Sequence, residues 1–264
     1  MDSNNFGKVG LFRSVISREG NIKVFAPPKG NDSEAFFALF PLNECVVEQY
    51  IEGTMINMFF DGEWEIATRS DVGGNFGFLQ TSDGESVTTF RSMFLEACNH
   101  ANFDFDNLDK DLCYSFVLQH PKNRIVTPFN ETNIYLVACY KIDNEHKIVH
   151  VVPVEDVKHT FEHSQISYPQ PIFSTADNYD EIKKMYASSN VDYTHVGAMI
   201  HHQRSGARTK IRNPNYEAVR KLRGNSPKDQ NRYLILRSER NVMKYLEYYP
   251  EDKAIFEVYY NQVN

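Results

Sequence analysis

The clearest alternation of apolar and polar residues lies between positions 54 and 70 of the chain. An Asp61-Gly62 pair interrupts this run, with Met58 and Phe60 before it and Trp64, Ile66 and Thr68 after it. A period of two is typical of a strand, and an Asp-Gly pair between two such runs is typical of a two-residue hairpin turn. We therefore predict an antiparallel hairpin, a structure that by itself carries no chemistry.

Other apolar runs predict further strands up to about residue 213 and helices beyond it. Strands are expected over 23–26, 35–40, 112–119, 133–140, 147–154 and 193–202. Residues 88–100 instead carry apolar side chains at helical spacing, behind a candidate N-cap at Thr88 or Thr89. The same spacing predicts helices over 179–188, 216–223 and 232–248. Together these elements predict an α+β fold that ends in a helical segment.

Composition limits the class of protein. A chain of 264 residues with 41% hydrophobic content is long enough for one large domain, or for one domain with a small appendage. No run approaches the roughly 18 apolar residues of a membrane span, and the polar start MDSNNFGK lacks the apolar core of a signal peptide. The four cysteines show no CxxC spacing, so reduced thiols are expected. We therefore expect a soluble, intracellular protein.

Charge is distributed unevenly along the chain. The net charge is −7, yet residues 204–240 carry eleven Lys and Arg against three Asp and Glu. Such an asymmetry is consistent with a basic face directed at phosphates, and equally with a solvated basic helix. Charge alone does not separate these two alternatives.

Four short segments follow one another along the chain, and their order is more informative than any one of them alone. The first is Tyr50-Ile51-Glu52-Gly53, followed by the predicted hairpin and by Ala67-Thr68-Arg69-Ser70. Residues 120–126 then read His-Pro-Lys-Asn-Arg-Ile-Val. The last two are Val196-Gly197-Ala198-Met199 and Lys210-Ile211-Arg212, with Tyr216 shortly after.

In this order the segments resemble motifs of the covalent nucleotidyltransferases, specifically the RNA ligase one-like family of phages and large DNA viruses. That family has Lys-x-(Asp/Glu)-Gly, whose lysine takes up AMP, then a hairpin and Ala-Thr-Arg-(Gly/Ser). An aromatic-Glu pair comes later, ahead of a segment like Leu-Ile-His-Pro-Glu-Asn-Arg-Ile-Val. Glu-Gly-x-Val and Lys-x-Lys with a following tyrosine complete the set.

The resemblance implies a fold and a division of the chain. The fold is the ATP-grasp-like nucleotidyltransferase fold of RNA ligases, in which antiparallel sheets surround a cleft. We expect a nucleotidyltransferase-like domain over residues 1–213. Residues 214–264 are expected to form a helical extension packed on it.

Three positions depart from the family pattern. Tyr50 stands where the family has its nucleophilic lysine, and Val117 and Val196 stand where it has glutamates. Valine cannot coordinate a divalent ion, which requires oxygen ligands, and a tyrosine hydroxyl is a weak nucleophile without an activating neighbour. The resemblance therefore implies a fold that has lost adenylyl transfer and holds neither a metal nor another cofactor.

What remains is a binding function. The expected ligand is a nucleotide or an RNA end, including a capped or modified mRNA 5′ end, because the superfamily also contains capping enzymes. The expected contacts are phosphates at Arg69, Lys210 and Arg212, a ribose or base edge at Glu52, and the base or sugar at Tyr50, beside Gly53 of the same frame. Trp64 is expected to pack the hairpin, with stacking on a base as the alternative.

Two other functions stay open at this point. The chain could be an active RNA ligase or nucleotidyltransferase that uses an atypical nucleophile. It could instead be a structural or protein-binding subunit of a larger complex, in which the cleft is vestigial and filled by side chains. The expected location is the cytoplasm, that of the host if the protein is viral, without a membrane partner.

Overall fold

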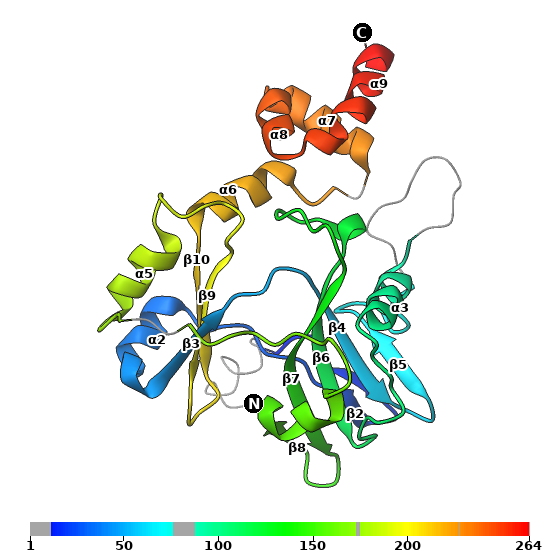
Figure 1. Ribbon diagram of the computed structural model, residues 1–264, viewed down its shortest axis with the longest axis vertical. Helices are drawn as coiled ribbons and strands as arrows, with labels where there is room; N and C mark the ends of the chain where they lie inside the picture. Colours follow the sequence, from blue (N-terminus) through cyan, green and yellow to red (C-terminus); the bar gives the residue numbers. More distant parts are fainter. Residues whose placement is uncertain (1–11, 76–87, 173–174, 227, 264) are drawn as a thin grey trace.

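The computed structural model describes residues 12–75, 88–172, 175–226 and 228–263. Figure 1 shows two β-sheets side by side, with α2 and α5 beside one and α3 beside the other. The last helices of the chain form a separate group above the two sheets. None of the helices in these ranges is long and apolar enough to cross a bilayer.

The larger sheet is antiparallel throughout. Its five strands lie in the order β5 (Trp64–Ala67), β4 (Thr54–Phe60), β6 (Leu112–Gln119), β7 (Asn133–Asp143) and β8 (Ile148–Val152). The predicted hairpin is confirmed, because Met58 pairs with Ile66 and Phe60 with Trp64. Its loop has three residues rather than the predicted two, and Gly62 supplies the positive φ of 85° that this loop needs.

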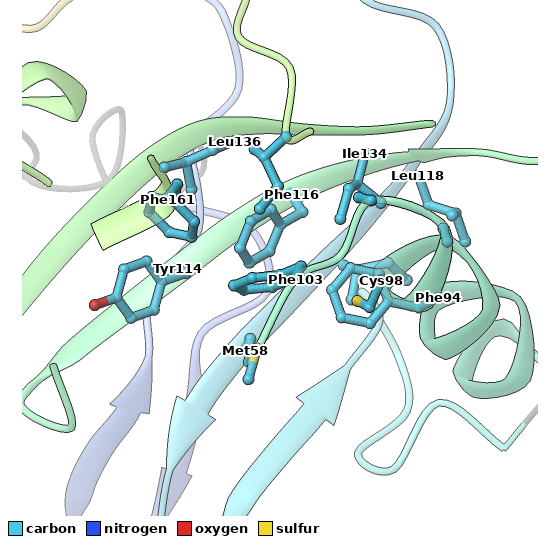
Figure 2. Packing of buried hydrophobic residues seen from close by; sticks show 14 of the residues in the cluster. Met58, Phe94, Cys98, Phe103, Tyr114, Phe116, Leu118, Ile134, Leu136 and Phe161 are labelled. Atoms are coloured by element: carbon cyan, nitrogen blue, oxygen red, sulfur yellow. The ribbon is translucent and has the colours of Figure 1, made fainter. Parts of the chain in front are cut away.

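Aromatic side chains form the core on one face of the larger sheet (Figure 2). Phe116 of β6 lies 5.6 Å from Phe94 and 5.7 Å from Phe103, measured between ring centroids. Phe94 belongs to α3 (Phe90–His100), which begins as predicted because the Thr89 side chain accepts a hydrogen bond from the Ser92 N–H. The helix α4 (Val154–Val157) and the 3₁₀ turn η3 (Lys158–Phe161) complete this layer.

The smaller sheet has three antiparallel strands, β10 (Arg208–Arg212), β9 (Gly197–His202) and β3 (Cys45–Gln49). Its outer face packs on α2 (Ser33–Leu39) and α5 (Tyr179–Ala187) through Phe36 and Ile182. A separate hairpin, β1 (Ile16–Arg18) and β2 (Asn21–Val24), contributes Val24 to a cluster with Phe59 of β4.

The strand predicted over 35–40 is wrong, because these residues form most of α2. Asp32 caps that helix by accepting a hydrogen bond from the Ala35 N–H at 3.1 Å. Phe36 and Phe40 lie one turn apart, so both rings reach the same side, with centroids 4.9 Å apart. A short apolar run of this kind fits either period, and packing against the smaller sheet decided between them.

The C-terminal helices are α6 (Pro214–Arg223), α7 (Asp229–Ser238), α8 (Val242–Tyr248) and α9 (Lys253–Val263). Their cluster includes Tyr216 and Tyr245, and it also takes in Val126 and Val196 from the sheet region. The helix predicted over 232–248 is interrupted, because Arg240 has a φ of 59°. The strand predicted over 193–202 begins only at Gly197. The domain boundary at residue 213 stays a prediction.

Residues 50–53 connect the two sheets. Gln49 ends β3 of the smaller sheet and Thr54 begins β4 of the larger one, so the four residues between them cross the gap (Figure 1). Short 3₁₀ turns occur at Leu42–Glu44, Pro121–Asn123 and Pro250–Asp252. The crossing places the segment that carries Tyr50 and Glu52 at the junction of the two sheets.

Candidate functional site

A cavity of about 280 Å³ lies between the two sheets and is bordered by the 50–53 crossing; we call it the main cavity. Its charged lining is basic: among the described residues, Arg13, Lys29, Arg69, Arg208 and Lys210 are set against the one carboxylate of Glu48. A concave surface with such an excess of cations favours anionic ligands.

One wall of the main cavity is the inner face of the smaller sheet. Lys210 of β10 is paired with Met199 of β9, which is paired in turn with Glu48 of β3, and Arg208 is paired with His201. All five line the main cavity, because residues two apart on a strand share a face. The residues between them point toward α2 and α5, so the small sheet has one charged face and one apolar face.

The facing wall is apolar and comes from the larger sheet. Met55 of β4 is paired with Val117 of β6, and both line the main cavity together with Val137 of β7. Pro27 and Pro28 also line the main cavity. Pockets for small molecules commonly combine an apolar surface with a few polar groups that fix the ligand's orientation.

Lys210 is the cation best placed to bind a ligand in the main cavity. Its side chain is half-buried, and no hydrogen bond or ion pair to it is recorded among the described residues. Burial lowers the pKa of the Lys210 ammonium group, and the positive charges of Arg212 and Arg13 lower it further. An anion bound here would relieve this repulsion, and the phosphate contact at Lys210 stays a prediction.

Arg212 contacts neighbouring side chains and does not line the main cavity. Its Nη2 donates to the Tyr50 hydroxyl at 2.8 Å, and its Nη1 is paired with Glu217. The guanidinium carbon also lies 5.3 Å from the centroid of the Tyr50 ring. Arg212 therefore positions Tyr50, which lines the main cavity and also a separate cavity of about 400 Å³ that contains Tyr135 and Tyr186.

Glu52 points away from the main cavity and serves the chain itself. It is 6% exposed, and one carboxylate oxygen accepts hydrogen bonds from the Val126 N–H at 2.8 Å and the Thr127 N–H at 3.1 Å. The other oxygen accepts from the Thr127 hydroxyl at 2.9 Å. These bonds tie the 50–53 crossing to the loop after β6. A ribose or base at Glu52, as predicted, would have to compete with them.

Gly53 has a structural reason to be glycine. Its φ is 150°, and an added Cβ would lie 2.4 Å from the carbonyl oxygen of Leu118 on β6. The crossing can therefore approach the larger sheet only without a side chain here. Arg69, by contrast, is exposed at the rim of the main cavity, just after β5.

Both valines at the departed motif positions are 7% exposed. Val117 lies in the apolar wall of the main cavity, and Val196 packs with the C-terminal helices. Mg²⁺ is commonly held by carboxylates together with substrate phosphates, but Glu48 already lies 2.7 Å from His201 Nε2. The described lining therefore fits a phosphate site built on cations better than one built on a metal.

Several residues of the main cavity escaped the sequence analysis. Arg208 could have been found, because it alternates with Lys210 and Arg212 in the run 208–212. Arg13 and Lys29 carry no such signal, since the fold brings them in from distant positions. Trp64 packs on Phe60 with ring centroids 5.5 Å apart, which agrees with its expected packing role.

Comparison with known proteins adds independent evidence for the resemblance to RNA ligases, although no family model matches this sequence. An RNA ligase of Rhodothermus phage RM378 is 28% identical over 164 residues, which make up 59% of this chain and 36% of that protein. The immediate-early protein ICP-46 of Frog virus 3 is 29% identical over 153 residues, 52% of this chain and 35% of that protein. The chain thus spans about a third of the length of these curated relatives.

The fold comparison leads to the same group of proteins. A mutant RNA ligase of Naegleria gruberi, solved with ATP and Mn, has a TM-score of 0.50 to this chain at 12% identity. The match covers 81% of this chain and 60% of the ligase. The predicted nucleotidyltransferase fold and the likeness to RNA ligases are confirmed.

The bonds of Glu52 predict a large effect on stability. Glu52→Ala should lower the free energy of unfolding by at least about 1–3 kcal/mol, because the buried Val126 N–H loses its acceptor. Glu63→Ala, at an exposed position in the hairpin loop, is the matched control and should change stability by less than about 0.5 kcal/mol. Urea unfolding of both variants checks this, and equal stabilities would contradict a bracing role for Glu52.

Proposed function

Because the chain is an RNA ligase-like protein with the nucleotidyltransferase fold, we propose that it binds a nucleotide or an RNA end in the main cavity without transferring a nucleotidyl group. The main observation behind this proposal is the opposition of two walls. Arg208 and Lys210 lie on the charged wall, and Met55 and Val117 belong to the apolar one. Arg13, Lys29 and Arg69 add further positive charge to the lining. Phosphates suit the first wall and a nucleobase the second.

The absence of transfer rests on the three departed motif positions. Tyr50 occupies the motif position of the lysine, and its hydroxyl accepts a hydrogen bond from Arg212. Val117 and Val196 offer no oxygen with which to hold a metal. Attack on an α-phosphate requires an activated nucleophile and compensation of the developing charge. In this proposal the cations bind phosphates but no group at position 50 attacks them.

A capped or modified RNA 5′ end is the most specific form of the proposal. Such an end presents several phosphates, for which Lys210 and Arg69 are available. A methylated, positively charged base would find an aromatic ring and a carboxylate in Tyr50 and Glu48. Host-cell cytoplasm is the setting in which a viral protein would meet such ends.

A second candidate function is supported by Lys210. A lysine in a nucleotide cavity whose pKa is lowered by burial can act as a nucleophile. Its amine would attack the α-phosphorus of ATP or GTP, form a phosphoramidate bond and release pyrophosphate. This is the atypical-nucleophile alternative, now with a named residue.

The structural-subunit alternative receives less support. A vestigial cleft would be filled by side chains, whereas the main cavity retains a volume of about 280 Å³. Its surplus of cations would also destabilise the fold by mutual repulsion if no anion ever bound there. Binding of an anionic ligand accounts for both features.

Lys210→Ala should weaken the binding of a 5′-phosphorylated single-stranded RNA. Loss of one phosphate contact should also reduce the slope of log Kd against log salt by about 0.7. The control is Lys244→Ala, which removes the same charge from an exposed position on α8. Fluorescence anisotropy at several salt concentrations measures the slope. Arg212 is left in place because its removal would also release Tyr50 and Glu217.

The wild-type chain should form no covalent adduct with α-labelled ATP or GTP in the presence of magnesium. Denaturing gel electrophoresis after incubation gives the result directly. A labelled band would contradict binding without transfer. If that band disappeared in Lys210→Ala but persisted in Lys244→Ala, the second candidate function would replace the first.

Tyr50→Ala should reduce ligand affinity by about 1–3 kcal/mol if the ring stacks on a base. The loss in the free energy of unfolding should stay below the roughly 3–5 kcal/mol that follows when an aromatic residue in a packed core is replaced by alanine, because Tyr50 borders open cavities. Tyr50→Phe keeps the ring and removes only the hydroxyl, so it should retain most of the affinity. Calorimetric titration with ATP, GTP and a cap analogue, together with urea unfolding, distinguishes the cases. A large stability loss in a chain that binds none of them would favour a filled, vestigial cleft.

A further inference from the structure

A second basic concavity lies beside the main cavity, at the C-terminal end of α6. It has a volume of about 390 Å³, and we call it the basic side cavity. Arg69, Arg220 and Arg223 line it, and among the described residues no aspartate or glutamate does. Arg69 lines the main cavity as well, so the two cavities share one arginine.

Three separate parts of the chain build the basic side cavity. Arg220 and Arg223 are three positions apart on α6 and therefore lie on the same side of that helix. Arg69 arrives from the segment that follows β5. Asn123 is buried in the floor and fixed there, because its Nδ2 donates to the Thr54 hydroxyl at 2.8 Å. The arginines therefore converge on a site with an ordered polar base.

The helix dipole explains only part of this arrangement. Basic residues in the last turn of α6 offset the partial negative charge of its C-terminus, and this accounts for Arg220, Lys221 and Arg223. It does not account for Arg69, which is exposed, comes from another element and has no recorded ion pair within the described part of the chain. The dipole of α6 therefore does not explain why Arg69 lies in the same cavity.

The local charge balance favours an anion. Glu217 is divided between Arg212 and Arg220 and lies 3.5 Å from the Arg220 Nη1. Burial lowers the pKa of the Arg223 guanidinium, and the positive charge of Arg232 lowers it further. One carboxylate therefore serves two arginines, and an anion bound by Arg220 would supply negative charge that Glu217 shares with Arg212.

We propose that the basic side cavity binds a backbone phosphate of the RNA whose end occupies the main cavity. This inference rests on the proposed function and extends it from the terminal nucleotide to the polymer. Arg69, present in both linings, would lie between consecutive phosphates. A mononucleotide would use the main cavity alone, whereas an RNA would use both, so the basic side cavity would select polymers over free nucleotides.

Arg220→Ala tests the proposal, with Lys221→Ala as its matched control. Both residues are exposed and lie in the last turn of α6, but only Arg220 lines the basic side cavity. The ligands are ATP and a short 5′-phosphorylated single-stranded RNA. Kd values are measured at 50 and 200 mM salt, and Arg220→Gln provides a second variant with a side chain of similar length if the alanine variant unfolds early.

For Arg220→Ala, the Kd for ATP should stay within about twofold of the wild-type value, because Arg220 does not line the main cavity. The increase in the RNA Kd between 50 and 200 mM salt should be about 2.5-fold smaller than in the wild type, because a complex with one phosphate contact fewer releases fewer counterions on binding. Lys221→Ala should retain the wild-type salt dependence.

The other outcomes separate the two proposals. If the wild type binds ATP and RNA but both Arg220 variants keep the wild-type salt dependence, the basic side cavity has no role and the proposed function stands. If Lys221→Ala matches Arg220→Ala, the effect is diffuse charge and the inference is overturned. A wild type that binds ATP but no RNA also overturns it. A wild type that binds neither ligand overturns the proposed function and this inference with it.

Discussion

The carboxylate of Glu52 holds together the part of the molecule on which the rest depends. It accepts four hydrogen bonds from Val126 and Thr127, while the neighbouring Gly53 lets the crossing approach β6. The crossing joins β3 of the smaller sheet to β4 of the larger one and borders the main cavity. A carboxylate buried in this way is stable because its oxygens accept bonds from backbone and side-chain donors. The frame that resembles a catalytic motif thus also has a bracing function.

Around this frame, the two sheets supply different surfaces of the main cavity. The smaller sheet presents its charged face inward and packs its apolar face on α2 and α5, whereas the larger sheet presents Met55 and Val117 to the same space. This separation produces a local positive field in a chain of net charge −7. Acidic surfaces elsewhere should discourage indiscriminate contact with nucleic acid, so an anionic ligand is favoured chiefly where the cavities concentrate the cations.

The basic segment 204–240 is less uniform than its charge suggests. Arg232 is 5% exposed and paired with Asp229 and Asp252, and Arg208 donates through its Nε to the Pro28 carbonyl oxygen. Arg232 stabilises the fold, and Arg208 does so while also lining the main cavity. Lys210 and Arg220 line cavities. The segment therefore mixes buried, paired arginines with cations that line cavities, and phosphate binding by the latter stays a proposal.

The sequence by itself determined the elements whose signals are local. The hairpin around Asp61, the capped helix α3, the strand β6 and the order of the nucleotidyltransferase motifs were all readable, because turn chemistry, capping and periodicity act over a few residues. The tertiary structure decided what depends on distant partners. The run 35–40 forms a helix that packs on the smaller sheet. Arg13 and Lys29 line the main cavity, although no pattern in the surrounding sequence predicts this. Arg212, predicted as a phosphate contact, is paired with Tyr50 and Glu217. Side-chain direction and charge pairing between remote segments follow from sheet register, which is fixed only when the whole chain has folded.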